Sequence, residues 1–84
     1  MISRLFIVWY GAPEVEITLG EDTHALNDGL FMVRSERTLS RLYHAIKWQL
    51  PDDTALAVAP LEAPPKFKGM APGALKWLRA GSGP

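Results

Sequence analysis

A continuous apolar run close to the N-terminus constrains this chain most. It covers residues 5–10 (LFIVWY) and is bounded by Gly11 and Pro13. Its length and its β-branched and aromatic content favour a β-strand over a helix. Successive side chains of a strand point to opposite faces of a sheet. Both faces of the predicted sheet therefore carry large apolar groups and need cover.

Further strand and turn signals follow this run. Apolar residues at 15, 17 and 19 alternate with polar ones, which predicts a half-buried strand paired antiparallel with the first. Residues 20–29 fit a loop, a short strand over 23–26 or a helical turn, and the sequence leaves these alternatives open. Within them, Asn27-Asp28-Gly29 indicates a turn, because all three residues tolerate positive φ. A third strand is expected over 30–33, and a fourth over 55–59.

One amphipathic helix lies between the last two predicted strands. Thr38 is the expected N-cap and Pro51 the stop. A shorter final helix is expected from Pro72, with Leu75 and Leu78 facing inward. In the first helix, the residues that gather on one apolar face are Leu39, Leu42, Tyr43, Ile46 and Leu50.

These elements predict an α+β fold. We expect a two-layer sandwich, with a mixed sheet of about four strands and two helices on one face. A strand–helix–strand unit with parallel strands, joined to an N-terminal hairpin, would make it a ferredoxin-like variant. Residues 1–81 form the single predicted domain and 82–84 a flexible tail. The conformations of 20–29 and 62–71 are not determined by the sequence.

The second sheet face predicts self-association. In a two-layer fold one set of side chains from the first strand lies away from the helices, and an exposed set would form a large apolar patch. We expect a homodimer that buries this face, because two-fold dimers are the commonest oligomers. The alternative is that the segment 62–70 folds across it. The residues assigned to the dimer face are Phe6, Val8 and Tyr10.

A stripe on the outer side of the amphipathic helix is the candidate protein-interaction site. Arg41, His44 and Trp48 are spaced at i, i+3 and i+7, so they share the side opposite the apolar face. Trp and Arg are enriched at binding hot spots. The alternative is that Trp48 packs on its own helix or under the C-terminal segment.

A second candidate surface lies near the C-terminus. Four basic residues and two aromatic ones are interleaved there without an acidic residue, a composition suited to single-stranded nucleic acid or to an acidic protein partner. Solvated lysines without a specific role are the alternative. The residues are Lys66, Phe67, Lys68, Lys76, Trp77 and Arg79.

Composition excludes several classes of function. With 84 residues and no cysteine, the chain has one core, no disulfide, no Cys-ligated zinc and no thiol nucleophile. Nine basic residues balance nine acidic ones, whereas a non-specific nucleic-acid binder has a positive excess. Motifs for phosphate, dinucleotide, zinc-protease and serine-hydrolase sites are missing. We expect no catalytic residue, no metal and no cofactor.

The N-terminal apolar run is also too short for a secretory signal or a membrane span. We therefore expect an intact cytoplasmic protein, of bacterial or phage type, without a membrane partner.

Residues 30–61 (LFMVRSERTLSRLYHAIKWQLPDDTALAVAPL) show a strand, a Ser/Thr-started helix, an Asp-bearing turn and a second strand. This pattern resembles part of the small ferredoxin-like nuclease subunit of CRISPR adaptation and its VapD-type relatives. The resemblance implies a ferredoxin-like dimer with affinity for nucleic acid. Active members carry an Asp at the end of the first strand, where this chain has Trp9, Tyr10 and Gly11. No catalytic residue is therefore carried over.

Taken together, the sequence predicts a small, non-catalytic binding protein that acts through protein–protein contacts and self-associates. A nucleic-acid-binding module that uses the C-terminal segment is the first alternative. A degenerate nuclease-like protein is the second.

Overall fold

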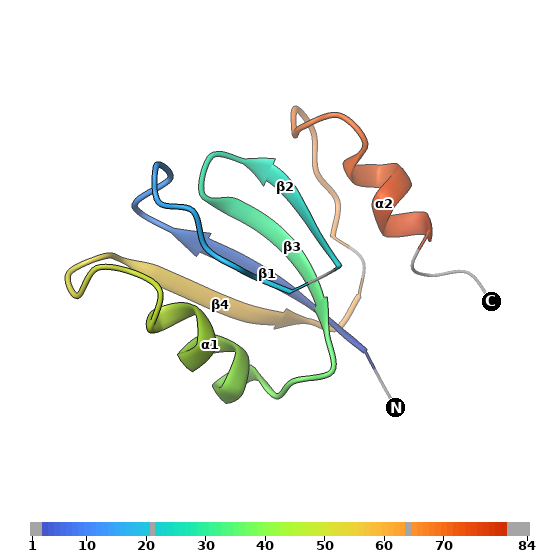
Figure 1. The fold of residues 1–84 in the computed structure, drawn as a ribbon. Coiled ribbons are helices and arrows are strands. Elements are labelled where there is room, and N and C mark those ends of the chain that lie inside the picture. The colour runs from blue at the N-terminus through green and yellow to red at the C-terminus, as the bar shows by residue number, and fades with distance from the viewer. Residues whose placement is uncertain (1–2, 21, 64, 81–84) are drawn as a thin grey trace.

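The computed structural model describes residues 3–20, 22–63 and 65–80. Its elements are β1 (Arg4–Tyr10), β2 (Thr23–Asn27), β3 (Leu30–Ser35), α1 (Leu39–Lys47), β4 (Leu56–Leu61) and α2 (Ala74–Ala80). One four-stranded sheet has the order β2-β3-β1-β4 (Figure 1). This arrangement confirms the predicted α+β fold class, with one sheet and two helices.

The sheet is antiparallel at every pairing, not mixed as predicted. β3 and β4 do run in the same direction, as a strand–helix–strand unit requires. However, β1 lies between them and is antiparallel to both. The crossover through α1 therefore skips a strand, so no parallel pair forms.

The face of the sheet beneath α1 holds the larger core. Phe6, Val8 and Tyr10 are 0 %, 0 % and 3 % exposed, and Leu42 and Ile46 of α1 belong to the same cluster. Figure 1 shows α1 beside β4 on this side. Because these three strand residues are buried within the chain, they cannot form the self-association face. That prediction is wrong.

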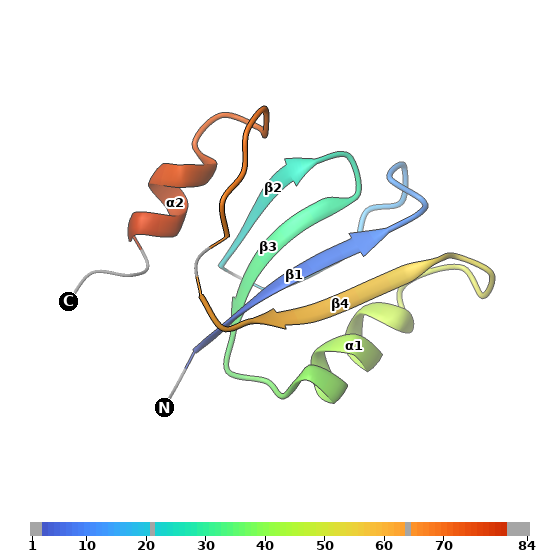
Figure 2. The ribbon, with the colours of Figure 1, turned by 180° about the vertical axis from the view of Figure 1, so that it is seen from behind.

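α2 lies on the opposite face, so the expectation that both helices share one face is also wrong. Leu26 and Met32 of the sheet form a second buried cluster with Ala74 and Leu78 of α2. Phe67 and Met70 of the preceding segment pack against this cluster, as the alternative for 62–70 anticipated. Figure 2 shows this segment and α2 on the side away from α1. Other segments of the same chain therefore pack on both apolar faces of the sheet.

The interior side of α2 differs by a few residues from the prediction. Leu78 is buried as expected, whereas Leu75 is 49 % exposed. Ala74 and the half-buried Trp77 take its place against the sheet. The helix begins at Ala74, two residues after Pro72.

The predicted strand over 15–19 does not form. Val15, Ile17 and Leu19 do pack against the core under α1, but both edges of β1 are already occupied by β3 and β4. Gln49 holds the segment instead: the Thr18 N–H donates to Gln49 Oε1 at 2.6 Å, and Gln49 Nε2 donates to the Thr18 carbonyl at 2.8 Å. The additional strand is β2, one of the alternatives left open for 20–29.

Two local predictions are confirmed. The Thr38 hydroxyl accepts a hydrogen bond from the Arg41 N–H at 3.3 Å and caps α1. Gly29 closes the β2–β3 hairpin with a φ of +71°, and a Cβ there would lie 2.5 Å from the Tyr10 carbonyl oxygen. Only glycine fits that position.

No helix in the described ranges is long and apolar enough to cross a bilayer. The predicted tail (82–84) lies outside the described residues.

Candidate functional site

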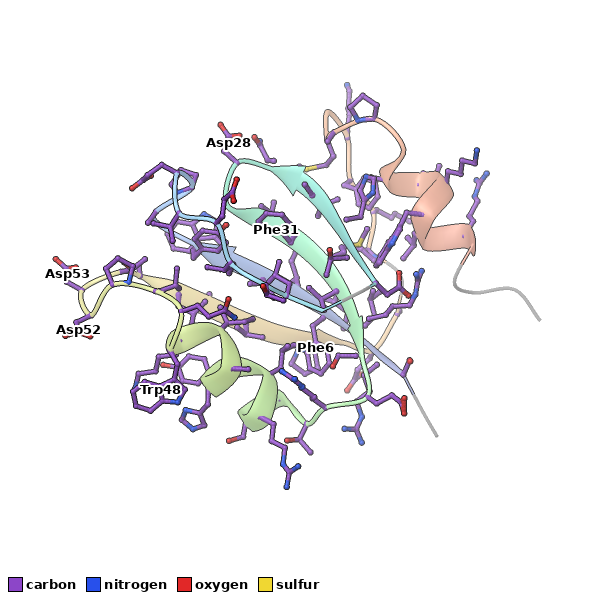
Figure 3. All side chains as sticks on the ribbon, viewed as in Figure 1. Phe6, Asp28, Phe31, Trp48, Asp52 and Asp53 are labelled. Carbon is purple, nitrogen blue, oxygen red and sulfur yellow. The ribbon has the colours of Figure 1, made fainter. Side chains whose placement is uncertain are left out.

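The outer side of α1 carries an exposed tryptophan among basic side chains. Arg41, His44 and Lys47 are all exposed, and Trp48, at the C-cap of α1, is 80 % exposed. We call these four residues the α1 surface. Figure 3 shows Trp48 projecting from α1, away from Phe6 and the sheet. The predicted outward position of Arg41, His44 and Trp48 is therefore confirmed, whereas their role stays a prediction.

A pocket of about 220 Å³ lies next to Trp48. Its lining includes Tyr43 of α1, Trp48 at the C-cap, Asp52 and Thr54 of the connecting loop, and Leu56 of β4. Sequence reasoning missed this pocket and placed Tyr43 in the core. The available signal was the place of Tyr43 at the border of the apolar face, where an amphipathic side chain is half-buried.

The α1 surface is positively charged. No acidic residue occurs between Arg37 and Pro51. Within the described ranges, the one ion pair joins Arg34 to Asp22, so the cations of the α1 surface have no carboxylate partner there. Lys47 Nζ instead lies 6.0 Å from the Tyr43 ring centroid and 5.9 Å from that of Trp48, near the limit of a cation–π contact.

The C-terminal candidate surface separates into two parts. Its four basic residues are exposed, but both aromatic residues turn toward the sheet. Phe67 packs against the second core cluster, and the Trp77 ring lies 3.9 Å from the Arg34 guanidinium carbon. The structure thus presents the charges of this segment but not its rings. The residues left on the surface are Lys66, Lys68, Lys76 and Arg79.

Arg34 is the structural residue that the sequence did not reveal. Its Nη2 donates to the carbonyls of Trp77 and Leu78 at 3.0 and 2.9 Å, so the guanidinium caps the last turn of α2. Nη1 lies 3.4 Å from Asp22 Oδ2. A single cation at the end of an apolar strand was the available signal. Arg34 thus holds α2 against the sheet by two means: its hydrogen bonds to the helix carbonyls and its stacking on Trp77.

His24 is the second residue beneath α2 with an unusual environment. Its ring stacks on Trp77 with 6.0 Å between centroids. Its Nε2 is buried without a hydrogen-bond partner, and a Cβ at Gly73 would lie 3.4 Å from its Cε1. No group of three or more metal-binding side chains forms in the described parts of the chain.

Comparisons with models of known protein families, with curated proteins and with solved structures gave no match. The resemblance of residues 30–61 to the CRISPR-adaptation nuclease subunit and VapD-type proteins therefore stays a prediction.

Proposed function

We propose that this protein is a small binding protein that acts through protein–protein contacts made by the α1 surface. The supporting observation is Trp48, 80 % exposed at the end of a well-packed helix. Tryptophan carries more binding energy per residue than most side chains once it is enclosed by a partner. The Trp48 ring borders the pocket, and the exposed basic residues Arg41 and Lys47 lie on the same helix.

The proposed partner is a different protein. Self-association was predicted from Phe6, Val8 and Tyr10, and their burial under α1 removes that argument. A cytoplasmic location and a bacterial or phage source stay predictions that accompany this proposal.

Substitution of Trp48 by Ala tests the proposal. Since little of this side chain is buried, we expect the melting temperature to stay within about 2 °C of the parent. Partner binding should fall by at least about tenfold, the loss typical of a hot-spot tryptophan. Trp9→Ala is the matched control, because Trp9 is 43 % exposed on the opposite face. Unchanged binding by the Trp48 variant contradicts the proposal, and so does a fall of many degrees in melting temperature.

Nucleic-acid binding by the C-terminal segment is the alternative function. Four exposed cations without an acidic residue between 65 and 80 support it, while the inward rings remove the stacking contribution. Retention on single-stranded DNA that weakens steeply with salt would favour it.

A further inference from the structure

The two edges of the sheet differ in how they are covered. At β2, the chain closes its own edge, because the Ala71 N–H donates to the Leu26 carbonyl at 2.8 Å. At β4, no backbone hydrogen bond from another described segment reaches the outer side of Leu56, Val58 or Pro60. An open edge strand is a template for an added strand.

The groups presented at this edge follow from the pairing of β4 with β1. The Gly11 N–H donates to the Ala55 carbonyl at 2.9 Å, so Ala55 faces β1. Because backbone groups alternate along a strand, residues 57, 59 and 61 also face β1. Leu56 and Val58 therefore direct their N–H and C=O groups outward. Pro60, which has no N–H, falls on the outer side, where proline is tolerated, and it limits how far pairing can extend.

The pocket beside Trp48 adjoins the same edge. Leu56 lies opposite Tyr10 in the register, so its side chain is on the α1 side of the sheet and forms one wall of the pocket. A strand added next to β4 would alternate its side chains between the two faces. The side chain that it places beside Leu56 on the α1 face would meet the ring of Trp48.

The charges near the β4 edge indicate which kind of chain could pair with it. Of the charged residues near this edge, Lys47 and Asp52 line the pocket, while Arg41 and His44 lie farther along the outer side of α1. In the described ranges no ion pair joins Arg41 or Lys47 to a carboxylate. A second copy paired through β4 would place two such helices next to each other on one face, since the two-fold axis would stand perpendicular to the shared sheet. That repulsion disfavours self-pairing and favours a segment with carboxylates.

We propose that β4 accepts an extended, acidic peptide segment of a partner protein as an additional strand. One large apolar side chain of the segment occupies the pocket between α1 and β4, and a carboxylate on the side of the pocket away from Asp52 meets Lys47. This inference rests on the proposed function of the α1 surface and names the class of partner. It corresponds to recognition by strand addition, in which the main chain supplies affinity and pockets supply specificity.

A displayed library of short random peptides, selected on the whole chain, is the probe. The expected consensus has a large apolar residue with Glu or Asp two positions away on one side of it, and binding should weaken as salt rises. N-methylation of the selected peptide at alternate residues should lower the affinity about tenfold where it removes an edge hydrogen bond, and little at the residues between.

Amide exchange read by NMR locates the added strand. Bound peptide should slow exchange at Leu56 and Val58, while Ala57 and Ala59, which already face β1, stay unchanged. If selected peptides lose binding with Trp48→Ala but leave Leu56 and Val58 unprotected, strand addition fails and the proposed function stands. If they protect this edge and bind Trp48→Ala equally well, Trp48 is not the anchor and the proposed function fails.

Two further outcomes overturn the proposed occupant. One is a basic consensus or no selected peptide. The other is protection of Leu56 and Val58 that rises with protein concentration without peptide, which would identify a second copy at the edge.

Discussion

Tyr10 links the core to the segment that follows β1. Its ring stacks on Phe31 with 5.9 Å between centroids, and its hydroxyl donates to the Val15 carbonyl at 3.2 Å. Burial raises the pKa of this phenol above its ordinary value of 10.0, and the carboxylates of Glu14 and Glu16 raise it further. Both causes disfavour the phenolate within the folded chain.

This shift predicts a loss of stability in alkali. Between pH 10.0 and the raised pKa, the unfolded chain releases a proton that the folded chain retains, so the free energy of unfolding falls as pH rises. Urea denaturation on both sides of that pH measures the slope. Tyr10→Phe should flatten it and Tyr43→Phe should not. Equal slopes for the parent and Tyr10→Phe would refute this assignment.

Gly29 offers a second test at the scale of one residue. A Cβ at this position would lie 2.5 Å from the Tyr10 carbonyl oxygen, which the hairpin cannot relieve without moving β1. We expect Gly29→Ala to lose about 1–3 kcal/mol of folding free energy to this clash alone. Gly69→Ala is the matched control, because Gly69 has a similar φ of +75° but nothing within 4 Å of the added atom. Equal losses in thermal unfolding of the two variants would mean that only the backbone angle matters.

At the scale of elements, α2 depends on one side chain from the sheet. Arg34 stacks on Trp77 and caps the final carbonyls of a helix of only 7 residues, a length that is marginal in isolation. The helix should therefore open more easily than the sheet beneath it.

Arg34→Met is expected to cost about 2 kcal/mol, the value of charge-assisted hydrogen bonds lost from a part-buried site. Amide exchange in α2 should accelerate, while exchange in β1 changes only through global stability. Arg79→Met, an exposed change on α2 itself, should leave this exchange almost as in the parent. Identical α2 exchange for the Arg34 and Arg79 variants would show that packing alone retains the helix.

Local sequence signals predicted the helices, strands and turns better than they predicted which strands pair with each other. The Thr38 cap, the hairpin turn at Gly29 and the strands around it follow from residue chemistry within a few positions, and all are present. Residues 15–19 show the limit. Their alternation correctly indicated which side chains are buried, but pairing requires a free edge on β1, and that depends on β4 arriving from far along the chain.

The candidate site shows the same division. Helical spacing alone places Arg41, His44 and Trp48 outward. The pocket was beyond reach because its walls come from both α1 and β4. Phe67 and Trp77 were misjudged as available for stacking, since the sequence did not show that α2 crosses to the other face and turns both rings inward.

At the scale of the whole molecule, self-coverage of both sheet faces predicts a monomer. α1 and the segment after β1 cover one face, while α2 and the segment before it cover part of the other. Light scattering over a range of concentrations should return a mass near 9.3 kDa. A mass twice as large that persists on dilution would show that the remaining exposed apolar residues, among them Trp9, associate after all.

The central position of β1 also affects when the protein can fold. Leu5 pairs with Leu61 in the finished sheet, so β1 lacks one of its two neighbours until β4 has been synthesised. Contacts of such long sequence separation slow folding. Until β4 is available, the apolar strand β1 has one unpaired edge, and the nascent chain is then most open to chaperone binding or misassembly.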